Sequence, residues 1–171
     1  MSAARFLIGK VLECQGRRGI IVETESYTTD LASHARSETP RSALMRQTYG
    51  HVYVYQTYGM YYCLNITTDK HAPGAVLIRA VEPIEGIDAM RKLRGVDSVT
   101  NIADGPGKLC QAFGISKKFN GTHIGDILKV YEGEETSPNQ IGSSPRIGIS
   151  QDTELHWRFF LKNSPFISTK K

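Results

Sequence analysis

One segment constrains the fold more than any other: residues 51–66, HVYVYQTYGMYYCLNI, in which aromatic and β-branched side chains dominate. Such side chains favour extended strands because they pack well on a pleated surface. The segment is interrupted at Thr57-Tyr58-Gly59, where the glycine permits the backbone of a tight turn. Two strand-forming runs on either side of such a turn predict a β-hairpin.

Strand signals outnumber helix signals along the rest of the chain. Further strand-forming runs lie at 10–14, 20–27, 75–82, 127–131, 146–149 and 158–161, and residues 28–46 form a polar stretch that predicts a loop. Because these runs follow one another in hairpin order, the sequence predicts an α+β fold. We expect a single domain over residues 1–171, with a curved antiparallel β-sheet flanked by a few short helices.

Three segments predict those helices. Residues 3–9 end in a glycine, as helices often do. Apolar residues spaced by three predict a helix within 83–93. In the segment 105–114, a proline near the start and a glycine at the end predict a third helix.

The composition is that of a folded domain. Hydrophobic residues make up 40% of the chain and charged residues 22%, which excludes disordered, collagen-like and coiled-coil chains. No apolar run approaches the roughly 20 residues of a membrane-spanning helix, and Met1–Lys10 lack the features of a signal peptide. We therefore expect a protein that is not secreted and works in a prokaryotic cytoplasm, or in the nucleus if its source is eukaryotic.

Cysteine spacing and net charge bound the chemistry. Cys14, Cys63 and Cys110 are far apart and have apolar neighbours, which predicts buried thiols in place of disulfides. No zinc-ligand spacing occurs, so we expect no metal site. The formal net charge of +4 is compatible with a polyanionic partner but is weak support by itself.

An acidic and aromatic group follows the apolar run 20–22. Glu23, Glu25 and Tyr27 alternate along a predicted strand, so they share one of its faces. A carboxylate that emerges from a buried strand can be held rigidly, as a general base must be. The competing interpretation is a solvated strand face whose glutamates pair with Arg or Lys across the sheet.

Tyrosines form a second group, since five of the eight in the chain fall between Tyr53 and Tyr62. Tyr53 and Tyr55 share a strand face, and strand aromatics of this kind commonly belong to the core. Tyr58 differs because it lies at the predicted turn, where the hairpin cannot cover it. A ring that projects from a hairpin tip has the shape of a wedge, and stacking on a nucleobase contributes about 1–3 kcal/mol.

Basic side chains form a third group, and they are Arg36, Arg41, Arg46, Arg79 and Lys108. Arg79 is expected at the end of a strand and Lys108 in the first turn of a helix. Such groups can contact phosphates, although solvated surface charge is the commoner role for any one of them. His34 and Asn65 indicate little by themselves.

Taken in order, these segments resemble the alkyladenine (3-methyladenine) DNA glycosylase family, the purine-excising enzymes of the non-helix-hairpin-helix type. The matching stretches are GIIVETESY (19–27), ASH (32–34), TPR (39–41), YVYQTYGMYYCLN (53–65), VLIRAVEP (76–83), GPGKLCQA (105–112), PRIGI (145–149) and RF (158–159). They span nearly the whole chain, and their conjunction is highly specific.

The resemblance implies a role for each matching residue. Glu25 corresponds to the general base that activates water, and Arg79 to a residue beside that water and the substrate phosphate. The remaining assignments are Tyr27, His34 and Tyr55 for the walls of the base pocket, Asn65 for the side chain that crowds the 2-amino group of guanine, Tyr58 for the residue inserted into the duplex, and Arg41 and Lys108 for contacts with DNA.

The implied function is a monofunctional DNA glycosylase of base excision repair that flips alkylated or deaminated purines out of duplex DNA and hydrolyses the N-glycosidic bond. The expected partner is double-stranded DNA that contains damaged purines, bound by a monomer without membrane, metal or cofactor. One alternative is a non-catalytic protein that binds damaged DNA through the Tyr58 wedge. Another is a formyltransferase-like or RNA-binding domain, which the combination of Glu25, Tyr27, Tyr55 and Tyr58 disfavours.

Overall fold

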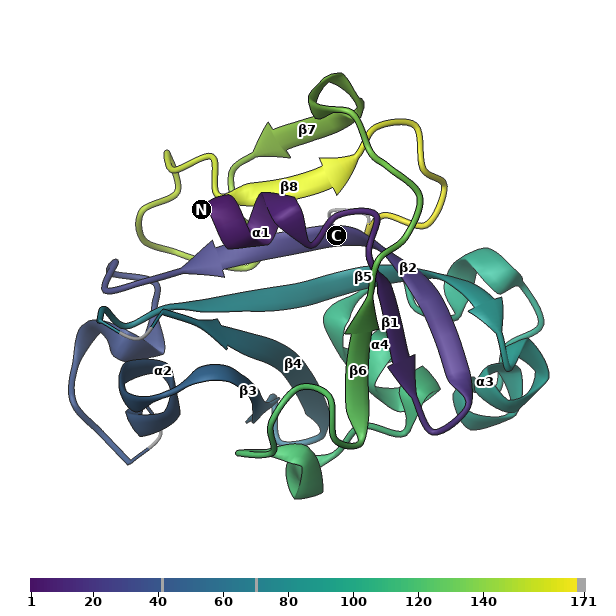
Figure 1. Ribbon diagram of the computed structural model, residues 1–171, viewed down its shortest axis with the longest axis horizontal. Helices are drawn as coiled ribbons and strands as arrows, with labels where there is room; N and C mark the ends of the chain where they lie inside the picture. The colour runs from purple at the N-terminus through teal and green to yellow at the C-terminus, as the bar shows by residue number, and fades with distance from the viewer. Residues whose placement is uncertain (41, 70, 169–171) are drawn as a thin grey trace.

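The computed structural model describes residues 1–40, 42–69 and 71–168, and these form a single α+β domain (Figure 1). The described strands belong to one curled antiparallel sheet with the order β3-β4-β5-β2-β1-β6, to which β7 and β8 are added through pairing of β8 with β2. The strands are β1 (Val11–Cys14), β2 (Arg17–Tyr27), β3 (Tyr49–Thr57), β4 (Tyr61–Thr68), β5 (Ala75–Glu85), β6 (Leu128–Tyr131), β7 (Ile141–Ser144) and β8 (Arg158–Leu161).

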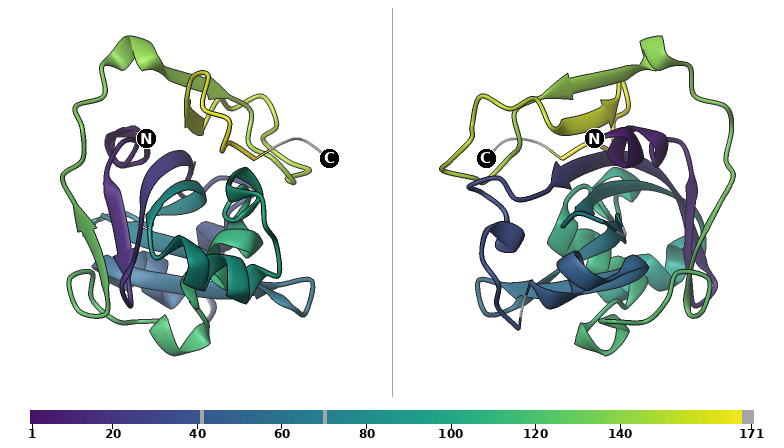
Figure 2. Two further views of the ribbon diagram at one scale, coloured as in Figure 1. Left: turned by 90° about the vertical axis from the view of Figure 1, so that its right-hand side faces the viewer. Right: turned by 60° about the vertical axis from the view of Figure 1, so that its left-hand side comes forward.

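Short helices surround this sheet in the described part of the chain. They are α1 (Ser2–Phe6), α2 (Ala43–Gln47), α3 (Ile87–Arg94) and α4 (Pro106–Phe113), with 3₁₀ turns η1 (His34–Arg36), η2 (Val99–Asn101), η3 (Lys117–Phe119) and η4 (Pro138–Gln140). Figure 2 shows α1 beside β7 and β8 at one end of the molecule, with α3 and α4 farther from that end. The expected α+β class, with its antiparallel sheet and few short helices, is confirmed.

Strand β2 is the element that positions the site, because it changes neighbours along its length. Its first half pairs with β1, whereas Glu23–Glu25 pair with β8 on the same edge. The other edge pairs with β5 from Arg18 to Tyr27, with register irregularities after Arg18 and on both sides of Glu23. The stretch that contains both glutamates is thus flanked by strands on both edges, and both side chains are fully buried.

The main hydrophobic core lies between the sheet and the pair α3 and α4. It contains Leu12, Ile21, Leu64 and Phe113, all fully buried. Helix α4 packs on β4 and β5. This packing holds the start of α4 next to the β3–β4 hairpin, where a Cβ on Gly107 would come within 3.1 Å of the Tyr61 side chain.

Most predicted elements are confirmed, and three differ. Residues 83–85 continue β5, and the helix expected within 83–93 begins only at Ile87, after Gly86 has turned the chain with a φ of 73°. The strand expected at 146–149 is absent: that stretch is an irregular loop after the true strand β7, and its Ile147 N–H bonds to a side chain. The predicted loop 28–46 contains η1 and the start of α2.

The three cysteines are free thiols and all are buried, as predicted. Burial raises the pKa of the Cys14 thiol to about 11, so this group stays protonated at neutral pH. Among the helices in the described ranges, none is long and apolar enough to cross a bilayer.

Candidate active site

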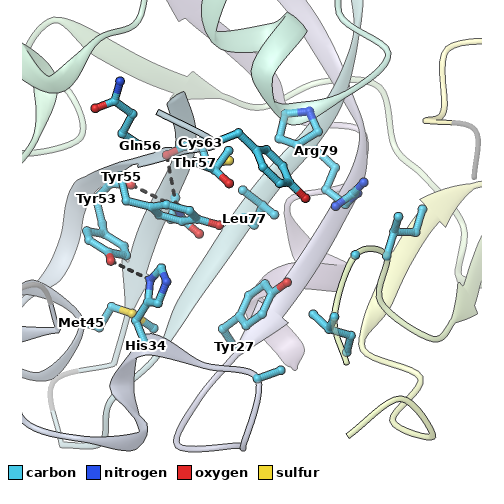
Figure 3. Close-up of a pocket in the computed structure, with 17 residues that line it drawn as sticks. Tyr27, His34, Met45, Tyr53, Tyr55, Gln56, Thr57, Cys63, Leu77 and Arg79 are labelled. Carbon is cyan, nitrogen blue, oxygen red and sulfur yellow. Dashed lines mark hydrogen bonds between the residues drawn. The ribbon is translucent and has the colours of Figure 1, made fainter. Parts of the chain in front are cut away.

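A cavity of about 620 Å³ opens between the end of β2, the β3–β4 hairpin, the start of α4 and two loops (Figure 3). One loop contributes Ala32 and His34, and the other contributes residues 147–149. The floor includes Asn65, Leu77 and Arg79 from the middle strands of the sheet. The cavity therefore collects side chains from segments that are far apart in the sequence.

Glu25 lies directly behind the wall of this cavity and is fully buried. Its Oε2 accepts a hydrogen bond from the Tyr27 hydroxyl at 2.9 Å and from Nη1 of Arg79 at 3.3 Å. Its Oε1 accepts one from the backbone N–H of Ile147 at 2.7 Å. All three donors belong to residues that line the cavity. Glu25 thus forms its ion pair with Arg79, a residue of the cavity wall, and its carboxylate is held next to the space that a ligand would fill.

Opposing influences set the proton affinity of this carboxyl. Burial raises the pKa of Glu25 above its ordinary value of 4.5, and the nearby Glu23 adds to that rise. The positive charge of Arg79 and the donors from Ile147 and Tyr27 act in the opposite direction. A carboxylate with a raised pKa is a stronger base than one in water.

Glu23, two residues earlier on the same strand face, makes a second and deeper set of contacts. Its Oε1 accepts hydrogen bonds from Nε of Arg79 at 3.1 Å and from Nε of Arg158 at 2.6 Å. The prediction that Glu23, Glu25 and Tyr27 share a face is confirmed. The competing interpretation is half right, since both glutamates pair with Arg79 across the sheet, but neither is solvated.

Aromatic rings form the sides of the cavity. Figure 3 shows Tyr27 from β2 on one side and Tyr53 and Tyr55 from β3 on the other, with His34 between them. Nδ1 of His34 lies 2.9 Å from the Tyr53 hydroxyl, and the His34 ring meets the Tyr55 ring edge-on at 4.7 Å between centroids. Burial raises the pKa of both Tyr27 and Tyr55, so both remain neutral hydroxyls. The cavity offers flat, rigid faces of the kind that bind a planar ring.

Asn65 is buried in the floor of the cavity. Its Nδ2 donates to the backbone carbonyl of Tyr53 at 3.1 Å and lies 3.4 Å from the carbonyl of Cys63. These bonds to neighbouring strand backbones hold the amide in one orientation. A fixed polar group beside aromatic walls is positioned to discriminate between ligands by shape and hydrogen bonding.

Tyr58 lies at the rim, at the tip of the β3–β4 hairpin, and is 85% exposed. Tyr58 and Gly59 have φ values of 50° and 69°, the positive values that a type I′ turn requires at its two central residues. Nε2 of Gln56 donates to the Gly59 carbonyl at 2.6 Å and closes the turn. The hairpin thus presents an uncovered aromatic ring at the mouth of the cavity, as expected.

The basic residues are distributed differently from the sequence prediction. Arg79 lies in the middle of β5, not at a strand end, and it is buried. Lys108 is in the first turn of α4 and pairs with Asp104 at 2.7 Å. Nη2 of Arg46 donates to the Ala35 carbonyl at 2.6 Å and so ties a loop together. Arg36 is exposed, and Arg41 lies outside the described residues.

Four residues of the site received no role from the sequence. Ile147 and Arg146 belong to the PRIGI stretch, and Arg158 and Ser168 contact Glu23. The guanidinium of Arg146 lies 4.6 Å from the centroid of the Tyr27 ring and supports it. The only available signal was that PRIGI and RF matched a family pattern. Within the described ranges, no three His, Cys, Asp or Glu side chains lie close enough together to hold a metal ion.

A buried carboxylate behind a cavity of aromatic faces, with an exposed ring at the rim, suits an enzyme that extracts and excises a nucleobase. Comparison with known proteins gives the same class, because the family model for methylpurine-DNA glycosylase (MPG) matches residues 1–165. The chain therefore belongs to the methylpurine-DNA glycosylase family, and the resemblance inferred from its motifs is confirmed.

Relatives across most of the chain agree with this membership. Proteins from Prosthecochloris aestuarii and Chlorobaculum tepidum are each 45% identical over 175 residues, covering 96% of this chain and 84% of theirs. A protein from Carboxydothermus hydrogenoformans is 45% identical over 157 residues, covering 89% of this chain and 82% of its own. All three carry the provisional name 3-methyladenine DNA glycosylase.

Proposed function

We propose that this protein flips alkylated or deaminated purines, of which 3-methyladenine is the type, out of duplex DNA and hydrolyses their N-glycosidic bond with a water activated by Glu25. The observation that carries the proposal is the convergence of three cavity-lining donors, from Tyr27, Arg79 and Ile147, on this one buried carboxylate. The family membership and the names of the relatives support the substrate class.

Base flipping accounts for the shape of the rim. A purine stacked inside a duplex cannot enter a cavity walled by β2 and β3, so it must be extruded at a cost of a few kcal/mol, which is lowest where pairing is already damaged. The ring of Tyr58 is free to occupy the vacated position in the stack. Stacking on neighbouring bases, at about 1–3 kcal/mol per base, offsets much of the cost of extrusion.

Selection of the base follows from the aromatic walls. A purine alkylated at N3 or N7 carries a positive charge, and a cation over a tyrosine face gains about 0.5–2 kcal/mol beyond the stacking itself. Tyr27 and Tyr55 supply such faces on different sides of the cavity, and His34 lies between them. In this proposal the fixed amide of Asn65 crowds the 2-amino group of guanine and disfavours the normal base.

The proposed reaction balances without a nucleophile from the protein. The bond between C1′ and the purine nitrogen breaks, and its electron pair stays with the departing purine. This pair neutralises the charge of an alkylated base, whereas a deaminated purine leaves as an anion and takes up a proton from water. The sugar becomes oxocarbenium-like, and the ionised Glu25 stabilises that positive charge. Water adds to C1′ and gives a proton to Glu25, which leaves an abasic sugar and an unbroken DNA strand.

Substitution of Glu25 by Gln tests the base. The amide keeps the size of the side chain but cannot take a proton from water, so the single-turnover rate of 3-methyladenine release should fall by about 10²–10⁴-fold. Binding to a duplex with an abasic-site analogue should be nearly unchanged. Glu85→Gln is the matched control: this side chain is on β5, 60% exposed, and pairs with Arg18 at 3.3 Å outside the cavity. Unchanged release by the Glu25→Gln variant refutes the assigned role.

A second candidate function is non-catalytic recognition of damaged duplex, which the exposure of Tyr58 favours. This function requires the exposed ring of Tyr58 but no general base. Incubation of purified wild-type protein with DNA treated with a methylating agent separates the two, because only the glycosylase releases free methylated purine. Tight binding of the lesion without release would favour the second candidate.

A further inference from the structure

We propose that Glu23 and Ser168 position Arg79 for the reaction, so that the C-terminal segment of the described chain controls the base although it does not touch the cavity. The inference rests on the proposed function and deepens it. Glu23 is not among the residues that line the cavity, so it is a positioning residue. Its effect on the reaction passes through Arg79.

Glu23 is the centre of a buried hydrogen-bond network. Its Oε1 accepts from Nε of Arg79, from Nε of Arg158 at 2.6 Å and from the Ser168 hydroxyl at 2.7 Å. Its Oε2 accepts from the Ser168 backbone N–H at 2.6 Å. Four hydrogen bonds from three residues compensate the cost of burying this carboxylate and hold it in place.

Arg79 is oriented by the same contacts. Its Nε donates to Glu23 at 3.1 Å, its Nη1 to Glu25 at 3.3 Å, and its Nη2 lies 3.4 Å from the Ser168 hydroxyl. Because a guanidinium is planar and its donors point in fixed directions, contacts on three sides determine its orientation. Two of the three come from Glu23 and Ser168. Arg79 therefore reaches Glu25 with one nitrogen instead of engaging it with two.

The number of Arg79 nitrogens that bind Glu25 affects the proton affinity of its carboxylate. A bidentate ion pair with Arg79 would occupy both carboxylate oxygens of Glu25 and lower its affinity for a proton. Glu23 prevents that arrangement by holding Nε, and its own charge is shared between Arg79 and Arg158. The single hydrogen bond from Arg79 thus holds Glu25 in place without lowering its proton affinity as far as a bidentate pair would.

The charges around Glu25 come from every neighbouring element. Glu23 and Tyr27 share its strand, Arg79 faces it from β5, and Arg158 is its register partner on β8. Arg146 pairs with Asp30 at 2.8 Å, and Tyr55 faces the carboxyl from β3. Among these groups Glu23 is the negative charge that raises the pKa of Glu25, in addition to the larger effect of burial, so we expect its removal to lower that pKa.

Ser168 is 145 residues from Glu23 in sequence, and the segment after β8 folds back to place it there. Figure 1 shows the yellow segment after β8 turning back toward β2. Nη2 of Arg158 also points to this segment, 3.4 Å from the Ser168 carbonyl. One short segment thus contacts both arginines and the carboxylate between them.

Glu23→Gln tests the proposal, with Glu85→Gln as the control for the same change of charge. The Gln variant should release 3-methyladenine about 10- to 100-fold more slowly, since a displacement of about 1 Å in a catalytic group can cost about 100-fold. Its binding to an abasic-site analogue should be unchanged. The acid limb of its pH–rate profile should move to lower pH, because Glu25 loses a negative neighbour. A wild-type rate, or a slower rate with an unmoved acid limb, would overturn the proposal.

Ser168 provides a milder test in case Glu23→Gln fails to fold. Ser168→Ala removes one hydroxyl donor and keeps the backbone N–H, so the release rate should fall several-fold with binding unchanged. Ser168→Thr retains a hydroxyl and should restore the rate, which a purely steric role would not produce. Equal rates for wild type and Ser168→Ala would contradict the inference. A wild-type protein that releases no base overturns the proposed function as well, whereas an active wild type with unaffected variants overturns this inference alone.

Discussion

Two requirements on Glu25, a high proton affinity and an ionised side chain, oppose each other. Its burial raises its pKa and makes it a better proton acceptor, but only the ionised form can accept a proton. The same shift makes the free energy of unfolding depend on pH. Because the pKa of Glu25 is higher in the folded than in the unfolded chain, protonation of Glu25 stabilises the fold. This stabilisation is fully present below the pKa of the unfolded chain and is lost as pH rises through the pKa of the folded chain. Ionised Glu25 therefore destabilises the fold in the pH range where the proposed general base would be active, a common cost of a functional group.

The pH dependence of base release follows from this shift. Activity should rise with pH as Glu25 ionises, and the midpoint of that rise should lie above the ordinary value of 4.5. Single-turnover release of 3-methyladenine from mildly acidic to neutral pH measures it, with spontaneous loss of the base subtracted at each pH. A midpoint at or below the ordinary glutamate value would show that Arg79 dominates over burial.

At the scale of elements, the β3–β4 hairpin divides its functions along its length. Its strands bring Tyr53, Tyr55 and Asn65 to the cavity, where packing and hydrogen bonds hold them. Its tip holds Tyr58 in a left-handed conformation with almost no cover. The strands therefore supply a rigid pocket, and the turn supplies a projecting ring that adds little to the core.

Tyr58→Ala should separate these functions. The variant should lose about 1–3 kcal/mol of stacking, roughly 10- to 100-fold in binding to lesion-containing duplex and in base release. Its melting temperature should stay close to that of the wild type, because the lost ring is exposed. Tyr49→Ala is the matched control, since this tyrosine is also exposed but starts the same hairpin at the opposite end of β3. Equal losses in both variants would show that Tyr58 has no special place in DNA binding.

At the scale of the whole molecule, net charge governs the encounter with DNA. The chain carries a formal charge of +4, while the charges nearest the reaction are paired with one another: Arg79 with Glu23 and Glu25, and Arg158 with Glu23. Buried pairs of this kind contribute orientation inside the site, whereas exposed residues such as Arg36 are available to a phosphate backbone.

Salt should therefore weaken binding to DNA without changing the chemical step. Each phosphate that the protein neutralises should contribute about −0.9 to the slope of log affinity against log salt concentration. Titration of a labelled abasic-analogue duplex at several salt concentrations measures this slope. The single-turnover rate at saturating protein should stay constant over the same range. A flat binding curve would rule out a phosphate-contacting surface.

Elements that depend on local pattern were predictable. The hairpin around Tyr58 and the helix bounded by Gly105 and Gly114 follow from turn chemistry and side-chain preferences a few residues apart. Prediction failed at 146–149, where a run typical of a strand forms a loop. Its Ile147 N–H bonds to Glu25, 122 residues away in sequence, and a local pattern carries no information about such a partner.

The alternation of Glu23, Glu25 and Tyr27 and the turn at Tyr58 were determined by the sequence alone, because backbone geometry acts over a few residues. Tertiary structure decided what those residues can do. It buried the two glutamates, placed Arg79 between them and brought Ser168 and Ile147 from the far end of the chain. The physical reason is that desolvation and charge act through space, so the proton affinity of Glu25 depends on neighbours that only the folded chain brings together.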